Sequence, residues 1–151
     1  MKLTICAVGR LKAGPERDLL EKYRRRITWP LDIIEIEERR KMSAADLKRR
    51  EGELIEKAVP PGSVRLAMDE RGKSMSSRDF ARRISEWRDG GQDVAFLIGG
   101  ADGLDTGLRS GADATVSFGT ATWPHQLARA MLVEQIYRAQ EILAGHPYHR
   151  D

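Results

Sequence analysis

The sequence contains a single cysteine and no long apolar stretch. Cys6 cannot form a disulfide within the chain, and its apolar surroundings predict a buried, unreactive thiol. No apolar run approaches the roughly 20 residues that a membrane-spanning helix requires. The opening segment "MKLTICAVGR" is short and charged early, which favours a first strand over a signal peptide. We therefore expect a cytoplasmic protein with no membrane segment.

Several signatures of common enzyme classes are also missing. The glycine-rich segment 99–103 lacks both the Gly-Lys-Ser/Thr ending of a P-loop and the G-x-G-x-x-G spacing of dinucleotide-binding proteins. No G-x-S-x-G nucleophile elbow is present. The three histidines, His125, His146 and His149, have no accompanying carboxylate–histidine ligand pattern. The sequence thus predicts neither a metal site nor a serine hydrolase.

Positive charge is concentrated in the first third of the chain. The formal net charge is only +3, but residues 1–50 hold 14 of the 26 Lys and Arg residues and 8 of the 23 Asp and Glu residues. The excess lies in three clusters, Arg24–Arg26, Arg39–Lys41 and Lys48–Arg50. Docking of a polyanion such as RNA would explain them. A solvated surface paired with the acidic residues of segment 35–38 is the alternative, and charge alone leaves both open.

Strand-like and helix-like patterns alternate along nearly the whole chain. The nearly continuous apolar run "DVAFLI" is typical of a strand covered on both faces. Strands are expected at 2–8, 31–37, 63–69, 93–98 and 114–118. Helices are expected from Pro15 to about Ile27, after a Ser43 cap, after a Ser76 or Ser77 cap, around Leu108, and from Pro124 to Ala144 before Gly145. The alternation predicts an α/β fold in one domain, 1–151, with a mostly parallel sheet and helices on both faces.

Ligands of such sheets collect beyond the carboxyl ends of strands, here the turns after Met68, Ile98 and Phe118. The glycines of 99–103 permit positive φ angles and close approach of a ligand to the main chain, although a plain tight turn fits as well. The segment "GTATWPHQLAR", residues 119–129, can offer backbone groups to an adenine edge, or can simply begin a helix.

The last predicted helix is apolar over a broad arc from Leu127 to Leu143. A helix of this kind is expected to be buried on two sides. The sheet can cover one side. A second subunit or other helices of a monomer can cover the other.

Four segments in order resemble the RlmH family of bacterial ribosomal large-subunit pseudouridine methyltransferases, in the SPOUT superfamily of knotted methyltransferases. They are "LIGGADG", "TATWPHQLAR", "EQIYRA" and the terminal "HPYHR", and the opening "AVGRLK" also matches. The resemblance covers the whole chain. Gly119 stands where the family more often has Ser, and Trp123 where a smaller aliphatic residue is usual. These departures concern side-chain contacts and leave backbone contacts unaffected.

The resemblance implies a C-terminal trefoil knot whose loops hold S-adenosylmethionine in a bent shape. Knots are otherwise rare in proteins. The positions that match the family's cofactor contacts are Met68, Gly100, Gly119, Thr120, Ala121, Thr122, Trp123 and Pro124.

The resemblance also implies methylation of N3 of a pseudouridine in large-subunit rRNA, by a homodimer without metal. The substrate would be free rRNA or an assembled ribosome. Tyr148, His149 and Arg150 would position the base and its phosphate or take up a proton, although a frayed terminus is the alternative. Two other functions stay open: a knotted methyltransferase acting on tRNA, and a non-catalytic RNA-binding factor that uses the basic clusters.

Overall fold

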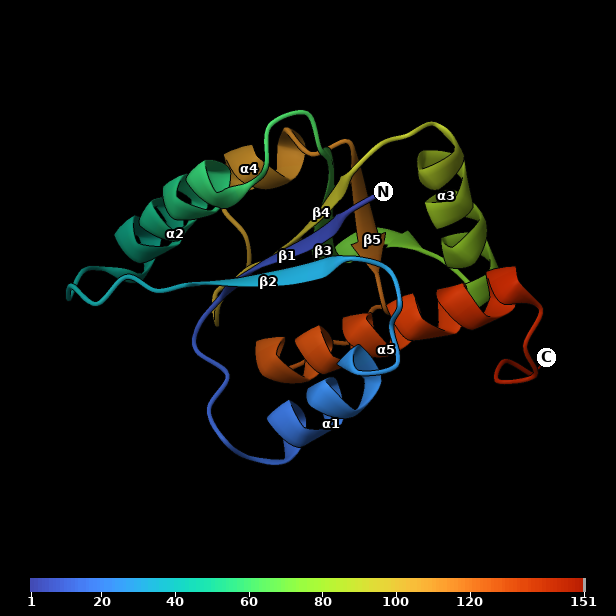
Figure 1. The fold of residues 1–151 in the computed structure, drawn as a ribbon. Helices are drawn as coiled ribbons and strands as arrows, with labels where there is room; N and C mark the ends of the chain where they lie inside the picture. Colours follow the sequence, from blue (N-terminus) through green and yellow to red (C-terminus); the bar gives the residue numbers. More distant parts are fainter. Residues whose placement is uncertain (151) are drawn as a thin grey trace.

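A five-stranded parallel sheet forms the centre of the molecule (Figure 1). The structure, a computed structural model, describes residues 1–150; Asp151, the last residue of the predicted tail, lies outside them. The strand order is β2-β1-β4-β3-β5, and each of the four pairings between these strands is parallel. The strands are β1 (Leu3–Val8), β2 (Leu31–Ile36), β3 (Val64–Ser74), β4 (Val94–Ile98) and β5 (Ala114–Ser117). The predicted α/β class is confirmed.

Five helices connect and cover the strands. They are α1 (Pro15–Arg24), α2 (Ala44–Ala58), α3 (Ser77–Asp89), α4 (Thr106–Ser110) and α5 (His125–Ala144). The predicted caps are confirmed: the Ser43 hydroxyl accepts the Asp46 N–H at 3.2 Å, and the Ser76 hydroxyl accepts the Asp79 N–H at 3.1 Å. Gly145, with φ of 74°, ends α5 as expected. Figure 1 shows α2 and α4 on one side of the sheet and α1 and α5 on the other.

The first helix is shorter than its sequence predicts. It ends at Arg24 rather than near Ile27, because the N–H groups of Arg26 and Ile27 bond to carbonyls only three residues back. The chain is then held by Gln140 of α5, whose side-chain oxygen accepts the Thr28 N–H at 2.6 Å. This tertiary contact, invisible in the local pattern, redirects the chain towards β2.

The third strand is longer than predicted and contains a bulge. Pairing with β5 is interrupted between Met68 and Lys73, both of which are opposite Val116. The interruption is stabilised locally, since the Asp69 carboxylate accepts the Arg71 N–H at 2.9 Å. A Cβ on Gly72 would lie 2.7 Å from the Thr115 carbonyl carbon, so the two strands approach too closely there for any other residue. The bulge replaces the simple turn expected after Met68.

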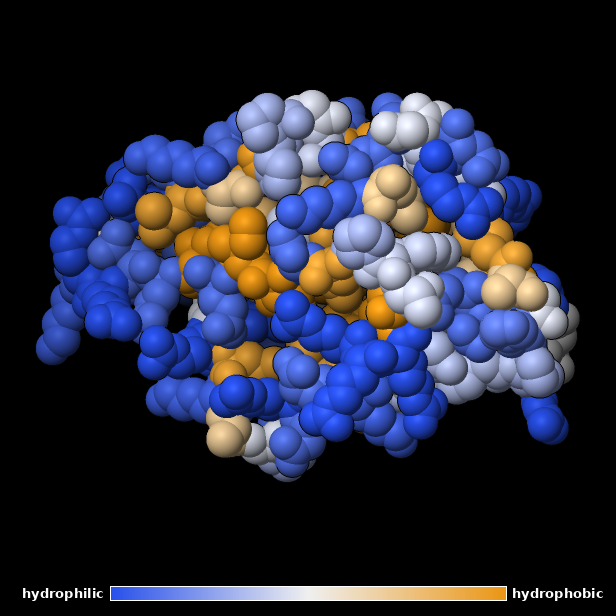
Figure 2. Space-filling view, viewed as in Figure 1, coloured by the Kyte–Doolittle hydropathy of each residue, from blue (hydrophilic) through white to orange (hydrophobic). Residues whose placement is uncertain are grey.

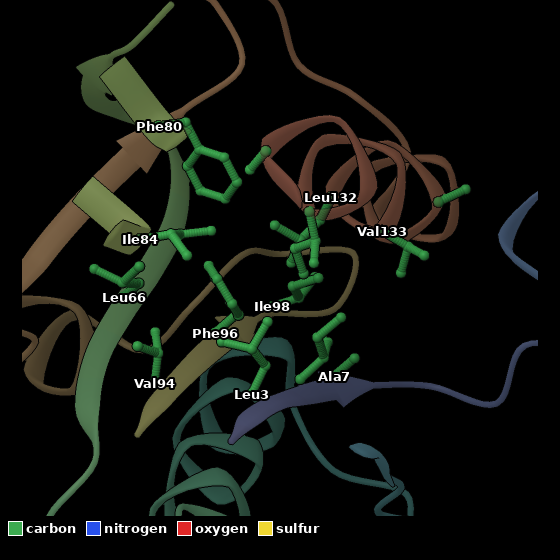
Figure 3. Packing of buried hydrophobic residues seen from close by; sticks show 14 of the residues in the cluster. Leu3, Ala7, Leu66, Phe80, Ile84, Val94, Phe96, Ile98, Leu132 and Val133 are labelled. Atoms are coloured by element: carbon green, nitrogen blue, oxygen red, sulfur yellow. The ribbon is translucent and has the colours of Figure 1, made fainter. Parts of the chain in front are cut away.

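Buried side chains form one hydrophobic layer on each face of the sheet. The larger layer joins the sheet to α1, α3 and α5; Figure 3 shows Phe80 and Ile84 facing Phe96 and Leu132 within it. The Phe80 and Phe96 ring centroids are 6.1 Å apart. The second layer lies under α2 and α4 and includes Ile55, Leu97 and Leu108. Burying each such side chain stabilises the fold by about 1.5–3 kcal/mol.

The broad apolar arc of α5 is covered within the chain. Its buried residues, among them Leu132, Val133 and Ile136, belong to the layer that also contains α1 and α3. The breadth of the arc therefore does not require a second subunit, and of the two covers that the sequence leaves open, other helices of the same chain are the one found. The physical reason is that two neighbouring helices, as well as the sheet, pack against α5.

In the view of Figure 2, apolar side chains gather mainly over the edge strand β2 and between α2 and α1, and a smaller group lies at the right beside α3. Ile34 of this strand is one of three large apolar side chains that the structure leaves exposed, with Leu19 and Trp123. Within residues 1–150, no helix combines the length and the apolar character needed to cross a bilayer.

Cys6 should not react with thiol reagents in the folded protein. Its side chain is fully buried in β1, and burial raises the pKa of the thiol to about 11, which keeps it protonated. Labelling with Ellman's reagent should therefore require denaturant. Rapid labelling of the native protein would show that β1 opens readily.

Candidate functional site

A cavity of about 260 Å³ lies where the carboxyl ends of β3, β4 and β5 meet. The three turns predicted from the sequence, after Met68, Ile98 and Phe118, all contribute to its walls, and the first turns of α5 close it. The lining residues are Met68, Asp69, Glu70, Arg71, Ile98, Gly99, Gly100, Ala101, Asp102, Gly103, Val116, Phe118, Thr122, Trp123, His125 and Ala128. The three places where the sequence predicts a ligand therefore share one cavity, and ligand binding there stays a prediction.

The glycine turn after β4 is folded tightly on itself. The Gly103 N–H donates to the Gly100 carbonyl at 3.0 Å, and a Cβ on Gly99 would lie 2.4 Å from the Gly103 carbonyl carbon. A Cβ on Gly100 would meet Val8 at 3.0 Å and the Glu51 carboxylate at 3.3 Å. The side of Gly100 that a side chain would occupy therefore faces α2 and β1. The main chain of the turn is therefore the part that faces the cavity.

The β3 bulge and the last loop are joined across the cavity. The Thr122 hydroxyl donates to the Glu70 carboxylate at 2.5 Å. Trp123 follows directly and is 43% exposed at the cavity wall. The loop that was predicted to bind a cofactor through its backbone is thus fixed to β3 by a side-chain hydrogen bond.

The titratable groups in and beside the cavity differ in the direction in which their pKa is shifted. The Asp69 side chain is only 6% exposed, yet its hydrogen bonds from Arg71 and the charge of Arg109 lower its pKa, so it stays ionised. Burial, with the neighbouring Asp102 charge, raises the pKa of Glu51 behind the glycine turn. Burial and the Arg129 charge lower the pKa of His125 and favour its neutral form. No cluster of three or more potential metal ligands occurs within residues 1–150.

Four of the eight predicted cofactor positions line this cavity: Met68, Gly100, Thr122 and Trp123. The other four, Gly119, Thr120, Ala121 and Pro124, belong to the same loop but do not line it. Gly119 has a φ of 109° and lines a neighbouring hollow with Ser74 and Phe118, which explains why glycine suits this position. The loop therefore presents two of its six predicted residues to the cavity.

The C-terminal tail packs on the far part of α5 instead of at the cavity. The Tyr148 hydroxyl donates to Glu134 at 2.9 Å, its ring meets the Tyr137 ring edge-on at 4.7 Å, and the Arg138 guanidinium lies 4.7 Å from the Tyr148 ring centre. His149 contacts Arg138 at 3.2 Å, and Arg150 is exposed. Tyr148 contacts Glu134, Tyr137 and Arg138, which follow Ala128 by six, nine and ten residues, or about 9–15 Å along the helix axis. Within one chain, the tail and the cavity are apart.

The three basic clusters have acidic neighbours. Arg24 lies 3.9 Å from Glu21, and Arg39 lies 3.5 Å from Glu37. Arg40 and Arg50 both bind Glu38 at 3.0 Å, which lowers the pKa of that carboxyl to about 2. Arg49 binds Asp46 at 2.7 Å. Much of the charge in these clusters is therefore locally balanced, and RNA docking by them stays a prediction.

Several cavity residues were not predicted. The bulge residues Asp69, Glu70 and Arg71 were missed because the strand was expected to end in a simple turn, although the polar run "DERG" was a usable signal. His125 and Ala128 lie in the segment 119–129 that was predicted to offer backbone groups to an adenine edge, but neither side chain was predicted to line the site. Both line the cavity because α5 begins directly beside it.

A family model described as "Predicted SPOUT methyltransferase" matches residues 1–149. The chain belongs to the SPOUT methyltransferase family. It is 55% identical to a protein of Rhodospirillum centenum and 53% identical to one of Paramagnetospirillum magneticum, both named "Ribosomal RNA large subunit methyltransferase H". Each match covers 99% of this chain and 99% of its relative. Family membership implies the C-terminal trefoil knot expected from the sequence.

Solved structures confirm the fold at low sequence identity. A methylase family protein of Haemophilus influenzae Rd KW20 is similar with a TM-score of 0.60 and 10% identity, over 99% of this chain and 70% of that one. A methyltransferase of Legionella pneumophila, solved with the cofactor SAM, has a TM-score of 0.51 and 14% identity, over 92% and 66%. At these identities the likeness concerns the arrangement of strands and helices alone.

The cavity fits the chemistry of a cationic nucleoside cofactor. The open main chain of the glycine turn can approach a flat base, and Met68, Val116 and Phe118 supply apolar walls. Asp69, Glu70 and Asp102 place carboxylates in the cavity walls, of which Asp69 is paired with Arg71 and Arg109.

Proposed function

We propose that the protein transfers a methyl group from S-adenosylmethionine to N3 of a pseudouridine in large-subunit rRNA. The observation that carries this proposal is the 55% identity, over 99% of both chains, to a protein named ribosomal RNA large subunit methyltransferase H. The cavity at the ends of β3, β4 and β5 is the proposed cofactor site. Met68, the main chain at Gly100 and the loop 119–124 would hold the cofactor, which supplies an activated methyl group.

The protein's contribution would be mainly positioning. Alignment of a nucleophile with the methyl group can supply much of a transfer rate, provided that the reacting atoms are held in line. The N3 proton of the pseudouridine must also leave. We assign orientation of the base and its phosphate, or uptake of that proton, to Tyr148, His149 and Arg150.

The proposed working unit is a homodimer. The tail contacts α5 about 9–15 Å along its axis from Ala128 and does not line the cavity of its own chain, so a second copy would bring a tail to each cavity. An apolar hollow of about 280 Å³ between α1 and α5, lined by Leu19, Tyr23, Phe118 and Met131 among others, is the proposed contact. Leu19 is 38% exposed there, which suits burial against a partner.

The proposed location is the cytoplasm, where the substrate would be free rRNA or an assembled ribosome. Mass analysis of rRNA fragments from a strain lacking the gene tests the substrate. We expect one large-subunit fragment to lose the mass of a single methyl group, with recovery when the gene is restored. Loss from a tRNA fragment would instead identify a tRNA methyltransferase. Unchanged RNA, together with retained RNA binding, would identify a non-catalytic binding factor.

A further inference from the structure

A second hollow, of about 440 Å³, opens beside the first turns of α5 between the β1–α1 loop, α1 and β2. We name it the cationic cleft. Its walls are Arg10, Leu11, Lys12, Arg17, Leu20, Glu21, Arg24, Ile33, Glu35 and Arg129. Figure 2 shows mainly hydrophilic residues over α1 and the loop before it. Five of the ten lining residues are cations, against two carboxylates.

Nearby carboxylates pair with only two of these five cations. Arg129 is 1% exposed and binds Glu35 at 2.8 Å, while Arg24 lies 3.9 Å from Glu21. Arg10, Lys12 and Arg17 are exposed, and Arg10 is close enough to Glu35 for its charge to help lower the pKa of that carboxyl. Lys12 and Arg17 have no hydrogen bond or ion pair within the described part of the chain. The cleft thus carries a surplus of about three positive charges in a concave surface.

The walls of the cleft are fixed in place by Arg129 and Glu35. Arg129 donates to the Val8 carbonyl at 3.1 Å and to the Gly9 carbonyl at 2.9 Å. Glu35 accepts the Leu11 N–H at 2.6 Å as well as the Arg129 guanidinium. The loop that carries Arg10 and Lys12 is therefore tied to both β2 and α5. A fixed loop presents its cations at a lower entropic cost than a mobile one.

The cleft adjoins the proposed cofactor cavity. Ala128 lines the cavity and Arg129 lines the cleft, so consecutive residues of α5 separate the two. His125 of the cavity also approaches the main chain at Gly9, since its Nε2 atom lies 3.4 Å from the Cβ position of that glycine. A strand held in the cleft would lie beside the methyl donor.

We propose that the cationic cleft binds the phosphodiester backbone of the substrate RNA next to the reacting nucleotide. This inference rests on the proposed function and assigns docking to Arg10, Lys12 and Arg17, rather than to the three basic clusters. Unpaired cations in a concave surface suit a chain of phosphates, and each contact with a single strand releases counterions. Base identity is not read by such contacts, so the cleft sets register rather than sequence preference.

The test compares two double variants of equal charge change. Lys12→Gln with Arg17→Gln alters the cleft, whereas Lys41→Gln with Lys57→Gln removes two exposed cations near α2, on the other side of the sheet. A fluorescein-labelled oligouridylate is titrated by anisotropy over a range of KCl concentrations. The cleft variant should bind about tenfold more weakly, and its slope of log K against log[salt] should fall by about 1.4, or about 0.7 for each contact. The control should keep both values.

Equal changes in both variants, or none in the cleft variant, would overturn the proposal. So would displacement of the RNA by polyglutamate as readily as by unlabelled RNA, since the cleft would then be a general anion surface. Calorimetry with S-adenosylmethionine should give the same affinity for both variants and the unaltered protein. If the unaltered protein bound no S-adenosylmethionine while the RNA results held, the proposed function would fail and the cleft would stand.

Discussion

Ala128→Phe should abolish binding of S-adenosylmethionine while leaving the fold intact. Ala128 is half-buried on the first turns of α5 and lines the cavity, so a phenyl ring there would fill the space that the cofactor needs. The cost to the helix itself is only about 0.5 kcal/mol. Calorimetry should show an affinity at least about a hundredfold lower, since a filled pocket loses most ligand contacts at once. Circular dichroism should show the native helix content.

The matched control is Ala45→Phe, an exposed alanine of α2 on the other face of the sheet, which should bind the cofactor normally. Gly100→Val is a less informative test. Its side chain would collide with Val8 and Glu51, so lost binding could reflect a displaced turn. Normal affinity in Ala128→Phe would contradict the assignment of the cavity as the cofactor site.

Deletion of residues 148–151 should abolish methyl transfer and spare cofactor binding. The tail lies outside the cavity and the hydrophobic layers, so its loss removes the proposed positioning groups without opening the core. Misplacement of a reacting group by about 1 Å can cost a hundredfold in rate, so we expect a loss of at least about that size. Transfer of labelled methyl to ribosomal particles from a deletion strain provides the measurement.

Tyr148→Phe separates docking of the tail from the chemistry of the Tyr148 hydroxyl. It removes the hydrogen bond to Glu134 but keeps the ring against Tyr137 and Arg138, so the tail should remain docked. Sedimentation velocity should report a dimer for the unaltered protein and for both variants. A truncated enzyme that methylates at the normal rate would remove Tyr148, His149 and Arg150 from the site. If the unaltered protein were a monomer, a site that combines the cavity of one subunit with the tail of another would be contradicted.

The fold was largely predictable because its local signals agree with its tertiary contacts. Ser43, Ser76 and Gly145 mark helix ends in the sequence, and the apolar run of β4 marks a strand buried on both faces. Prediction failed where a distant residue decides the local structure. Gln140 holds the chain that leaves α1 early, and the close contact of Gly72 with Thr115 accompanies the bulge in β3. Neither interaction has a local sequence pattern.

The site was predictable at the level of turns and less so at the level of side chains. Parallel topology brings the ends of β3, β4 and β5 together, which the alternating pattern already implied. The cations of the cleft are not predictable from the sequence, because Arg10, Lys12 and Arg17 do not form a consecutive run of Arg and Lys. The sequence already offered acidic partners for the runs, whereas only the fold shows that the isolated cations share a hollow.

The all-parallel sheet also has a consequence for how the chain folds. No strand pair of residues 1–150 can form as a hairpin, and the central pairing of β1 with β4 joins Leu3 to Val94. Pairings between such distant segments must overcome a large loop-closure entropy, so folding is expected to be slow. The cavity needs the ends of three strands and the start of α5. A ligand can therefore bind only after β5 and α5 have docked. Ligand binding is thus a probe of completed folding and not of any earlier stage.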